Sequence, residues 1–426
     1  MARFPFMFLL SRRRRGASFA LALGLWLAAA TASAAPRVVA VGDVHGDLPA
    51  FRAILVEAGL LDASGTWSGG DAVLVQLGDL IDRGPKMRGT LDFAMVLEAQ
   101  AAARGGRLVA LLGNHEVMNM TGDLRYVAPE NYAEFADAGS EKRRADAWNA
   151  VVELRKSRAR KLGLPEAPTG AAAREAWLAE HPPGYLEQRE AFGPGGVYGR
   201  WLRLRSACVL EQGSVFLHGG LSPALVGVSV EEVDRRVHED LATFDADRTL
   251  FVAQGLILPF FDLQETFRAL REELEALEAA EAALRAAADR AGKTYAPAAL
   301  VAERRSVYQH FLEWEKWTIN SPDGPLWFRG YSRWSDAEGN REVPRLLAAL
   351  HVERLVVGHT VQQDGRIHVR FGDAVYMIDS GMLSTHFPGG RASALEIADG
   401  VVSAIYPGEP RKVLWEPPAK KVAALR

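Results

Sequence analysis

The stretch that decides the fold is Val38-Val39-Ala40-Val41-Gly42-Asp43-Val44-His45-Gly46-Asp47. Its first four residues form an apolar run that is typical of a buried strand. The run ends at a glycine, and a carboxylate and an imidazole follow two residues apart. Both groups bind Mn, Fe or Zn, and the flanking glycines let the backbone turn sharply around an ion. The motif therefore indicates a metal site or an ordinary turn, and the ends of later strands decide between them.

Four later apolar runs also end in a glycine-linked polar group. The strands expected at 72–77, 107–112, 215–217 and 354–357 lead into Asp79, Asn114, His218 and His359, respectively. Helical spacing of apolar residues separates the first three strands, and such strand–helix–strand units form parallel sheets with right-handed crossovers. Ligand sites in open α/β sheets gather at the carboxyl ends of the strands. We therefore expect an α/β fold in which five strand ends converge on one site.

The five strand-end motifs, taken together, identify a family. They are Gly42-Asp43-Val44-His45-Gly46, Gly78-Asp79-Leu80-Ile81-Asp82-Arg83-Gly84, Gly113-Asn114-His115-Glu116, His218-Gly219-Gly220 and Gly358-His359-Thr360. In residues and in order they resemble the calcineurin-like metallophosphoesterases of the phosphoprotein phosphatase branch. The resemblance covers about residues 37–120 and 195–400. With the N-terminal segment, the helical inserts and residues 199–203, it is greatest to the Shewanella-like bacterial phosphatases.

This resemblance implies a calcineurin-like β-sandwich flanked by helices, with two metal ions in its site. The first ion would be bound by Asp43, His45 and Asp79, and the second by Asp79, Asn114, His218 and His359. Asp79 suits the bridging position because the two oxygens of a carboxylate can neutralise two cations. The ions would be Mn, Fe or Zn, among which the sequence does not choose. Hydroxide bound to the metals would then attack the phosphorus of a phosphate monoester.

The resemblance also assigns residues to proton transfer and to phosphate binding. His115 would protonate the leaving oxygen as a general acid, and Asp82 would orient its ring. Arg83 would bind two phosphate oxygens through its planar guanidinium group. Arg329 is the candidate for the second arginine of this clamp. Arg333 is the alternative, because the residues that follow Arg329 depart from the family pattern.

Three other residues with reactive side chains are not assigned to metal binding or catalysis. Glu116 is expected to be a structural acceptor rather than a catalytic group. His386, which follows Asp379 by seven residues, is a further candidate to face the site. Cys208 is the one cysteine of the chain, so an intramolecular disulfide and a cysteine-rich metal site are both excluded.

Two alternatives to a monoester phosphatase remain on the sequence alone. The same scaffold could hydrolyse phosphodiesters or dinucleotide polyphosphates, or it could be an inactive binding protein. The complete ligand set argues against the inactive protein, because a degenerate site usually loses one of these residues. A phosphorylated protein, a peptide and a small phosphoester all remain open as substrates, because the fold and its motifs do not determine specificity.

Residues 1–34 have the layout of a secretory signal peptide. A basic cluster at 12–15 precedes an apolar run at 17–30, and Ala32-Ser33-Ala34 is a cleavage signature. A transmembrane anchor is the alternative, but this run is short for the ~20 residues that span a bilayer. We expect an exported, periplasmic protein with no stable membrane anchor after cleavage. Ser11-Arg12-Arg13 resembles a twin-arginine signal, so that route and the Sec route both remain open.

The charge of the processed chain argues against nucleic acid as a partner. Residues 1–34 contain five arginines and no acid, so their removal changes the net charge from −3 to −8. An acidic chain is a poor candidate for binding a phosphate backbone.

The rest of the chain is expected to form one metallophosphoesterase domain over residues 35–407, followed by a tail at 408–426. Helical insertions are expected at about 123–190 and 262–320, and short strands between 366 and 406 are expected to form a β-meander. An apolar a/d stripe from Leu263 to Leu284 predicts a helical hairpin in the second insertion. The hairpin could be a lid, a dimer surface or an insert packed on its own domain, and the sequence leaves the oligomeric state open.

Overall fold

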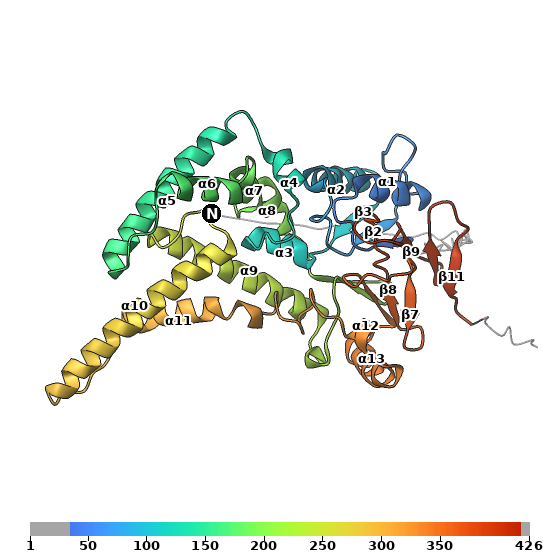
Figure 1. The fold of residues 1–426 in the computed structure, drawn as a ribbon. Helices are drawn as coiled ribbons and strands as arrows, with labels where there is room; N and C mark the ends of the chain where they lie inside the picture. Colours follow the sequence, from blue (N-terminus) through green and yellow to red (C-terminus); the bar gives the residue numbers. More distant parts are fainter. Residues whose placement is uncertain (1–34, 419–426) are drawn as a thin grey trace, which may run out of the picture. The chain divides into compact units, whose positions relative to one another are not determined.

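A computed structural model describes residues 35–418, which form two β-sheets and the helices around them (Figure 1). The first sheet contains β1 (Val38–Val41), β2 (Val73–Gln76), β3 (Arg107–Ala110), β9 (Ala394–Ala398), β10 (Val401–Ile405) and β11 (Lys412–Trp415). The second sheet contains β4 (Cys208–Glu211), β5 (Ser214–Leu217), β6 (Arg354–Val357), β7 (His368–Arg370) and β8 (Val375–Met377). Their orders are β11-β10-β9-β1-β2-β3 and β4-β5-β6-β8-β7.

The parallel start that the strand–helix alternation predicts is confirmed, because β1, β2 and β3 pair in parallel. In the second sheet, β5, β6 and β8 are also parallel. The five strands β1, β2, β5, β6 and β8 are buried along their whole length. Strands covered on both faces are apolar along most of their length rather than at alternate positions, which explains the nearly continuous apolar runs in the sequence.

The strands divide their side chains between three hydrophobic cores. Val38 and Ala40 of β1 pack with Phe216 of β5 and Val356 of β6 in a core between the two sheets. Alternate residues of the first sheet, such as Val39, face a second core that is shared with helices. A third core covers the face of the second sheet that points away from the first sheet. The molecule is therefore a β-sandwich with helices outside both sheets, as the motifs predict.

The helices fall into groups along the chain. The first group is α1 (Leu48–Glu57), α2 (Met87–Ala102) and α3 (Asn114–Thr121). Between α3 and β4 lie α4 (Pro129–Phe135), α5 (Ser140–Leu162), α6 (Ala171–Glu180), α7 (Tyr185–Phe192) and α8 (Val197–Leu202). Between β5 and β6 lie η1 (Pro223–Leu225), α9 (Val230–Ala253), α10 (Leu263–Arg290), α11 (Ala299–Leu312), η2 (Trp314–Lys316), α12 (Gly330–Arg333) and α13 (Asp336–Leu350). Tyr331 of α12 and Val343 of α13 pack on the outer face of the second sheet.

Within residues 262–320, α10 and α11 run side by side (Figure 1). The helix α10 begins at a capping box, in which the Asp262 carboxylate accepts the Glu265 N–H and the Glu265 carboxylate accepts the Asp262 N–H. Glu281 of α10 forms an ion pair with Arg305 of α11. The second helix of the predicted hairpin ends at Leu312, and a 3₁₀ turn follows it.

The C-terminal strands differ from the predicted β-meander. The β7–β8 hairpin belongs to the second sheet, whereas β9, β10 and β11 extend the first. Lys412–Trp415, within the segment expected to be a tail, forms β11 and pairs with β10. Local sequence shows that strands are present, but which sheet a strand joins depends on contacts with residues far away in the chain. No helix in the described part of the chain has the length and apolarity to span a bilayer.

Candidate metal centre

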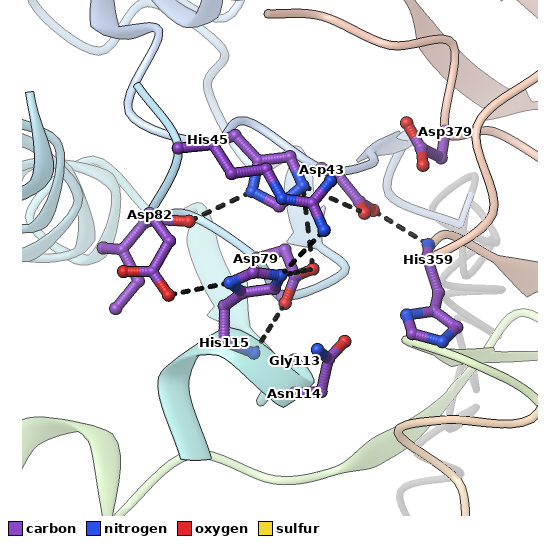
Figure 2. A network of polar contacts seen from close by, with 12 residues as sticks. Asp43, His45, Asp79, Asp82, Gly113, Asn114, His115, His359 and Asp379 are labelled. Carbon is purple, nitrogen blue, oxygen red and sulfur yellow. Dashed lines mark hydrogen bonds and ion pairs between the residues drawn. The ribbon is translucent and has the colours of Figure 1, made fainter. Parts of the chain in front are cut away.

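The five predicted strand ends lie together at one edge of the two sheets. Asp79, Asn114 and His115, which follow β2 and β3, line one cavity with His45 and His359, which follow β1 and β6. His218, which follows β5, is fully buried beside them and lies 2.9 Å from Asn114. Figure 2 shows most of these side chains converging from different segments of the chain. The sequence prediction that these residues lie close together is therefore met by the fold.

Sharp turns at the strand ends aim the side chains into the site. Five of its residues have a positive φ angle, which non-glycine residues rarely adopt: His45 (51°), Asp79 (55°), Asp82 (69°), Arg83 (66°) and His359 (66°). The first two turns are tied together, because the Asp79 carbonyl accepts the N–H groups of Val44 and His45, both at 2.9 Å. A Cβ at Gly113 would collide with the Asp79 carboxylate, which explains the glycine there.

Asp79 lies at the centre of the donor atoms. Its Oδ2 is 3.8 Å from Nε2 of His45, 3.8 Å from Nε2 of His115 and 3.3 Å from Nε2 of His218. Figure 2 shows the contacts from Asp79 to the rings of His45 and His115. Asp79 therefore belongs to two groups of residues whose donor atoms all lie within 4.8 Å of one another, one with His45 and His115 and one with His218 and His359.

The donor atoms around His218 have the spacing of ligands that share an ion. Nε2 of His218 is 2.9 Å from Oδ1 of Asn114, 3.1 Å from Nδ1 of His359 and 3.3 Å from Oδ2 of Asp79. Two ligand atoms that each lie about 2.1 Å from one ion are roughly 3.0–3.4 Å apart at usual bond angles. The three distances from His218 are thus compatible with ligands that share an ion.

The second ring nitrogen of each of two histidines is fixed by the backbone. Nδ1 of His45 donates to the Ile81 carbonyl at 3.1 Å, and Nδ1 of His218 donates to the Leu77 carbonyl at 2.8 Å. This arrangement leaves Nε2 of both rings facing the Asp79 carboxylate. Metal-binding histidines almost always donate their other N–H in this way, so the backbone contacts support a metal site.

Two further carboxylates adjoin the centre. Asp43 accepts the His359 N–H through Oδ1 at 3.0 Å, and its Oδ2 lies 3.8 Å from Nε2 of His45. Asp379 follows β8, and its Oδ2 is buried without a hydrogen-bond partner in the described residues. The prediction of site residues omits Asp379, although the same signal was present, because an apolar run ends there in Asp379-Ser380-Gly381.

The electrostatics of the buried carboxylates favour a cation. Burial raises the pKa of Asp43 well above its usual range, and the charge of Asp379 acts in the same direction. Burial also raises the pKa of Asp379, to about 6. Burial would raise the pKa of Asp79 too, but His218 and His115 outweigh it and lower that pKa. Three buried carboxylates are costly unless positive charge compensates them, and a metal ion would supply that charge.

A chain of hydrogen bonds holds His115. Its Nδ1 lies 2.7 Å from Oδ2 of Asp82, as predicted for an orienting carboxylate (Figure 2). Both oxygens of Asp82 also accept from Nδ2 of Asn119, at 2.9 and 3.0 Å, and Oδ1 of Asn119 accepts from Gln188 of α7 at 2.7 Å. Sequence reasoning missed Asn119 and Gln188, because nothing local to either residue marks them.

Glu116 supports the loops rather than facing the cavity. Its Oε2 accepts the N–H groups of Asp79 at 2.7 Å and Gly113 at 2.9 Å, and its Oε1 accepts the Leu80 N–H at 2.8 Å. The side chain is fully buried. These contacts match the structural role expected of Glu116, because one carboxylate ties together the turns that follow β2 and β3.

Two arginines line the cavity, whose volume is about 280 Å³, and neither has a carboxylate partner in the described part of the chain. The guanidinium of Arg83 lies 3.3 Å from Nε2 of His115 and packs against the rings of Tyr126 and Phe387. Nη1 of Arg329 donates to the carbonyl of His359 and to Thr360.

Arg329, and not the alternative Arg333, therefore lines this cavity. His386 is exposed and lies outside its lining, where Phe387 stands instead.

The two-sheet sandwich, with carboxylates, histidines and arginines together at one edge, has the architecture and the residue types of a metallophosphoesterase. Residues 36–247 match the model of the calcineurin-like phosphoesterase family. The chain belongs to this family, as its motifs predict, and it is an enzyme of the phosphoester hydrolase class.

Relatives agree with this assignment. An uncharacterised protein of Schizosaccharomyces pombe is 27% identical over 386 residues, which are 87% of this chain and 81% of that protein. Shewanella-like protein phosphatase 2 of Arabidopsis thaliana is 32% identical over 215 residues, about half of each chain (50% and 53%).

Among solved structures, a cold-active protein-tyrosine phosphatase of a psychrophilic Shewanella species has the same fold. Its TM-score is 0.51 at 22% identity, and the match covers 89% of this chain and 81% of that one.

Proposed function

We propose that the protein is a two-metal phosphatase that hydrolyses phosphate monoesters of a protein, a peptide or a small molecule. The observation that carries the proposal is the position of Asp79, whose Oδ2 lies within 3.8 Å of three histidine nitrogens and belongs to both donor groups. One ion would be held by Asp43, His45 and Asp79, and a second by Asp79, Asn114, His218 and His359. Bound ions would act as Lewis acids on the phosphoryl oxygens and would lower the pKa of the attacking water.

The two arginines favour a monoester over a diester. Arg83 and Arg329 line the cavity, and neither forms an ion pair with a carboxylate among residues 35–418. A terminal phosphate group carries up to two charges and three free oxygens, whereas the phosphate of a diester carries one charge and two free oxygens. Two guanidinium groups can therefore be satisfied together by a monoester.

His115 would supply the proton to the leaving oxygen. Asp82 holds Nδ1, so that Nε2 is the nitrogen that lines the cavity beside Arg83. The ring is 1% exposed, which keeps it in a single orientation. A general acid in this position typically contributes about 10²–10⁴-fold to the rate.

The proposal is tested by comparing p-nitrophenyl phosphate with bis-p-nitrophenyl phosphate. The protein is first stripped with a chelator and then restored with Mn, Fe or Zn. We expect the stripped protein to be inactive, and at least one metal to restore hydrolysis of the monoester in preference to the diester. Preference for the diester would favour a phosphodiesterase. Absence of hydrolysis with every metal would favour a binding protein.

A panel of phosphotyrosine, phosphoserine and phosphothreonine peptides then addresses the natural substrate class. The solved relative named a protein-tyrosine phosphatase makes phosphotyrosine the first peptide to examine.

A further inference from the structure

A second cavity adjoins the candidate active site and shares two of its walls. It has a volume of about 320 Å³ and is lined by Arg125, Asn320, Pro322, Trp327, Arg329 and Arg333. Trp327 and Arg329 also line the cavity of the metal centre. Three of the six lining residues are arginines, and none is an acid. We call this cavity the arginine pocket.

The arginine pocket carries positive charge that is not neutralised locally. The side chain of Arg333 is exposed and makes no hydrogen bond or ion pair with any described residue. Arg329 donates only to uncharged groups, the His359 carbonyl and the Thr360 hydroxyl. Arg125 is the exception, because it forms an ion pair with Asp123. Two guanidinium groups therefore have no carboxylate partner among residues 35–418 and can bind an anion.

The geometry also brings like charges close together. Arg329 and Arg333 line the same cavity, and none of the residues that line it with them is an acid. Like charges held at one cavity repel each other, and an anion between them relieves the repulsion. In addition, Nε1 of Trp327, which borders both cavities, is buried and has no acceptor in the described residues.

Isolated surface arginines are common and need no ligand, but the arrangement here differs in two respects. The arginines surround a cavity rather than project from a flat surface, and the cavity shares Arg329 with the site where the phosphate would bind. An anion in the arginine pocket would thus lie beside the phosphate that is hydrolysed.

We propose that the arginine pocket is a second anion subsite, which binds a phosphate or carboxylate group close to the phosphorylated residue of a polypeptide substrate. The inference rests on the proposed phosphatase function and narrows its substrate class. A polypeptide suits the geometry because an extended chain advances about 7 Å over two residues. A neighbouring side chain can therefore reach the adjoining cavity while the phosphorylated residue occupies the metal centre. Arg333 would be the main determinant of this preference, with Arg125 assisting.

The test uses synthetic phosphopeptides of one length. Each carries one phosphorylated residue, and a second position, scanned from three residues before it to three residues after it, holds Gln, Glu or phosphoserine. For the best position we expect kcat/KM to exceed that of the Gln peptide by about tenfold or more, mainly through a lower KM. Comparison of Glu with phosphoserine shows whether the subsite takes a carboxylate or a phosphate.

Variants connect the preference to the pocket. Arg333→Gln should reduce the preference for the two-anion peptide by about fivefold or more, and Arg333→Gln combined with Arg125→Gln should abolish it. The Gln peptide should be affected much less, because it does not reach the pocket. Arg345→Gln is the matched control, since Arg345 is an exposed arginine, paired with Glu342, that lines neither cavity.

Equal kcat/KM for all peptides in the unchanged protein would overturn the proposal, as would a preference that survives in the double variant. If the proposed phosphatase function is wrong, neither p-nitrophenyl phosphate nor any of the peptides will be hydrolysed. In that event, the affinities of peptides that carry a non-hydrolysable phosphonate, measured by calorimetry, show whether the arginine pocket binds an anion. Tighter binding of the two-anion peptide, lost in the double variant, supports it, and equal binding contradicts it.

Discussion

His45, Asp79, Asp82, Arg83 and His359 all adopt left-handed backbone conformations, each of which costs about 1–3 kcal/mol in a non-glycine residue. Such conformations persist only where the surroundings fix them. Here the Asp79 carbonyl and the Glu116 carboxylate bind the backbone N–H groups of the turns. These backbone conformations direct the candidate metal ligands and phosphate-binding groups toward one cavity. We infer that stability is given up at these residues in favour of the site.

Replacement of His115 by Asn tests its role as the general acid. Asn cannot deliver a proton, so we expect kcat to fall about 10²–10⁴-fold. The metal content should stay unchanged, because His115 is not among the residues proposed to bind either ion. Elemental analysis and steady-state kinetics on the same sample provide both values. Loss of metal in this variant would show that His115 is a ligand, as its place in the donor group with His45 and Asp79 allows.

At the scale of elements, hydrogen bonds connect α7 of the first insertion to α3, which carries the candidate general acid His115. Asn119 of α3 donates to both oxygens of Asp82, and Gln188 of α7 fixes the orientation of the Asn119 amide. Arg189 of α7 also donates to the Asn119 carbonyl, at 2.8 Å. The helices between α3 and β4 therefore do more than cover the sheet, because they hold a residue that positions Asp82 and, through it, His115.

Asn119→Ala should lower kcat by about tenfold while KM and metal content change little. Without the amide, the charge of Asp82 acts on His115 alone. This change should raise the pKa of His115 and move the basic limb of the pH–kcat profile to higher pH. Thr121→Val is the control, because Thr121 is buried on the same helix and donates only to α3 carbonyls. If the pH–kcat profile of Asn119→Ala is not shifted, Asn119 has a structural role and does not affect the pKa of His115.

The strand ends could be predicted because their signal is local. An apolar run that leads into a ligand residue with a glycine beside it marks Asp43, Asp79, Asn114, His218 and His359, and the structure brings all five together. Asp379 carries the same signal without the family motif and was missed. Asn119 and Gln188 could not be predicted, because their function depends on contacts across 37 and 69 sequence positions.

At the scale of the whole molecule, the sandwich is closed by strands from opposite ends of the chain. β9 pairs with β1 in antiparallel orientation, so residues near 395 complete a sheet that begins at 38. Pairing between strands so far apart in the sequence cannot be recognised from local sequence. For this reason the prediction placed the C-terminal strands in one meander, whereas the structure divides them between two sheets. The signal-peptide interpretation concerns residues 1–34, which lie outside the described residues, and export stays a prediction.

Phe311 of the second insertion packs against aromatic residues of α9, and a substitution there can separate stability from catalysis. Phe311 is fully buried, and its ring centroid lies 5.1 Å from those of Phe244 and Phe251. Phe311→Ala should lower the free energy of unfolding by about 3–5 kcal/mol, as measured by denaturant titration. Leu284→Ala, at a position that is 56% exposed, should change it by less than about 0.5 kcal/mol.

Activity on p-nitrophenyl phosphate should persist in Phe311→Ala under conditions where the protein is folded. Complete loss of activity in a folded Phe311→Ala protein would instead assign the insertion a direct part in the metal centre.

Asp79 is proposed to join two metal ions, and the metal content of Asp79→Asn tests this bridging position. An amide has one ligand oxygen and no charge, so it cannot bridge two cations. Elemental analysis after gel filtration should find about two ions per chain in the unchanged protein and one or fewer in the variant. Asp323→Asn, at an exposed residue outside both cavities, should retain two. Two ions retained in Asp79→Asn, or none in the unchanged protein, would contradict the account.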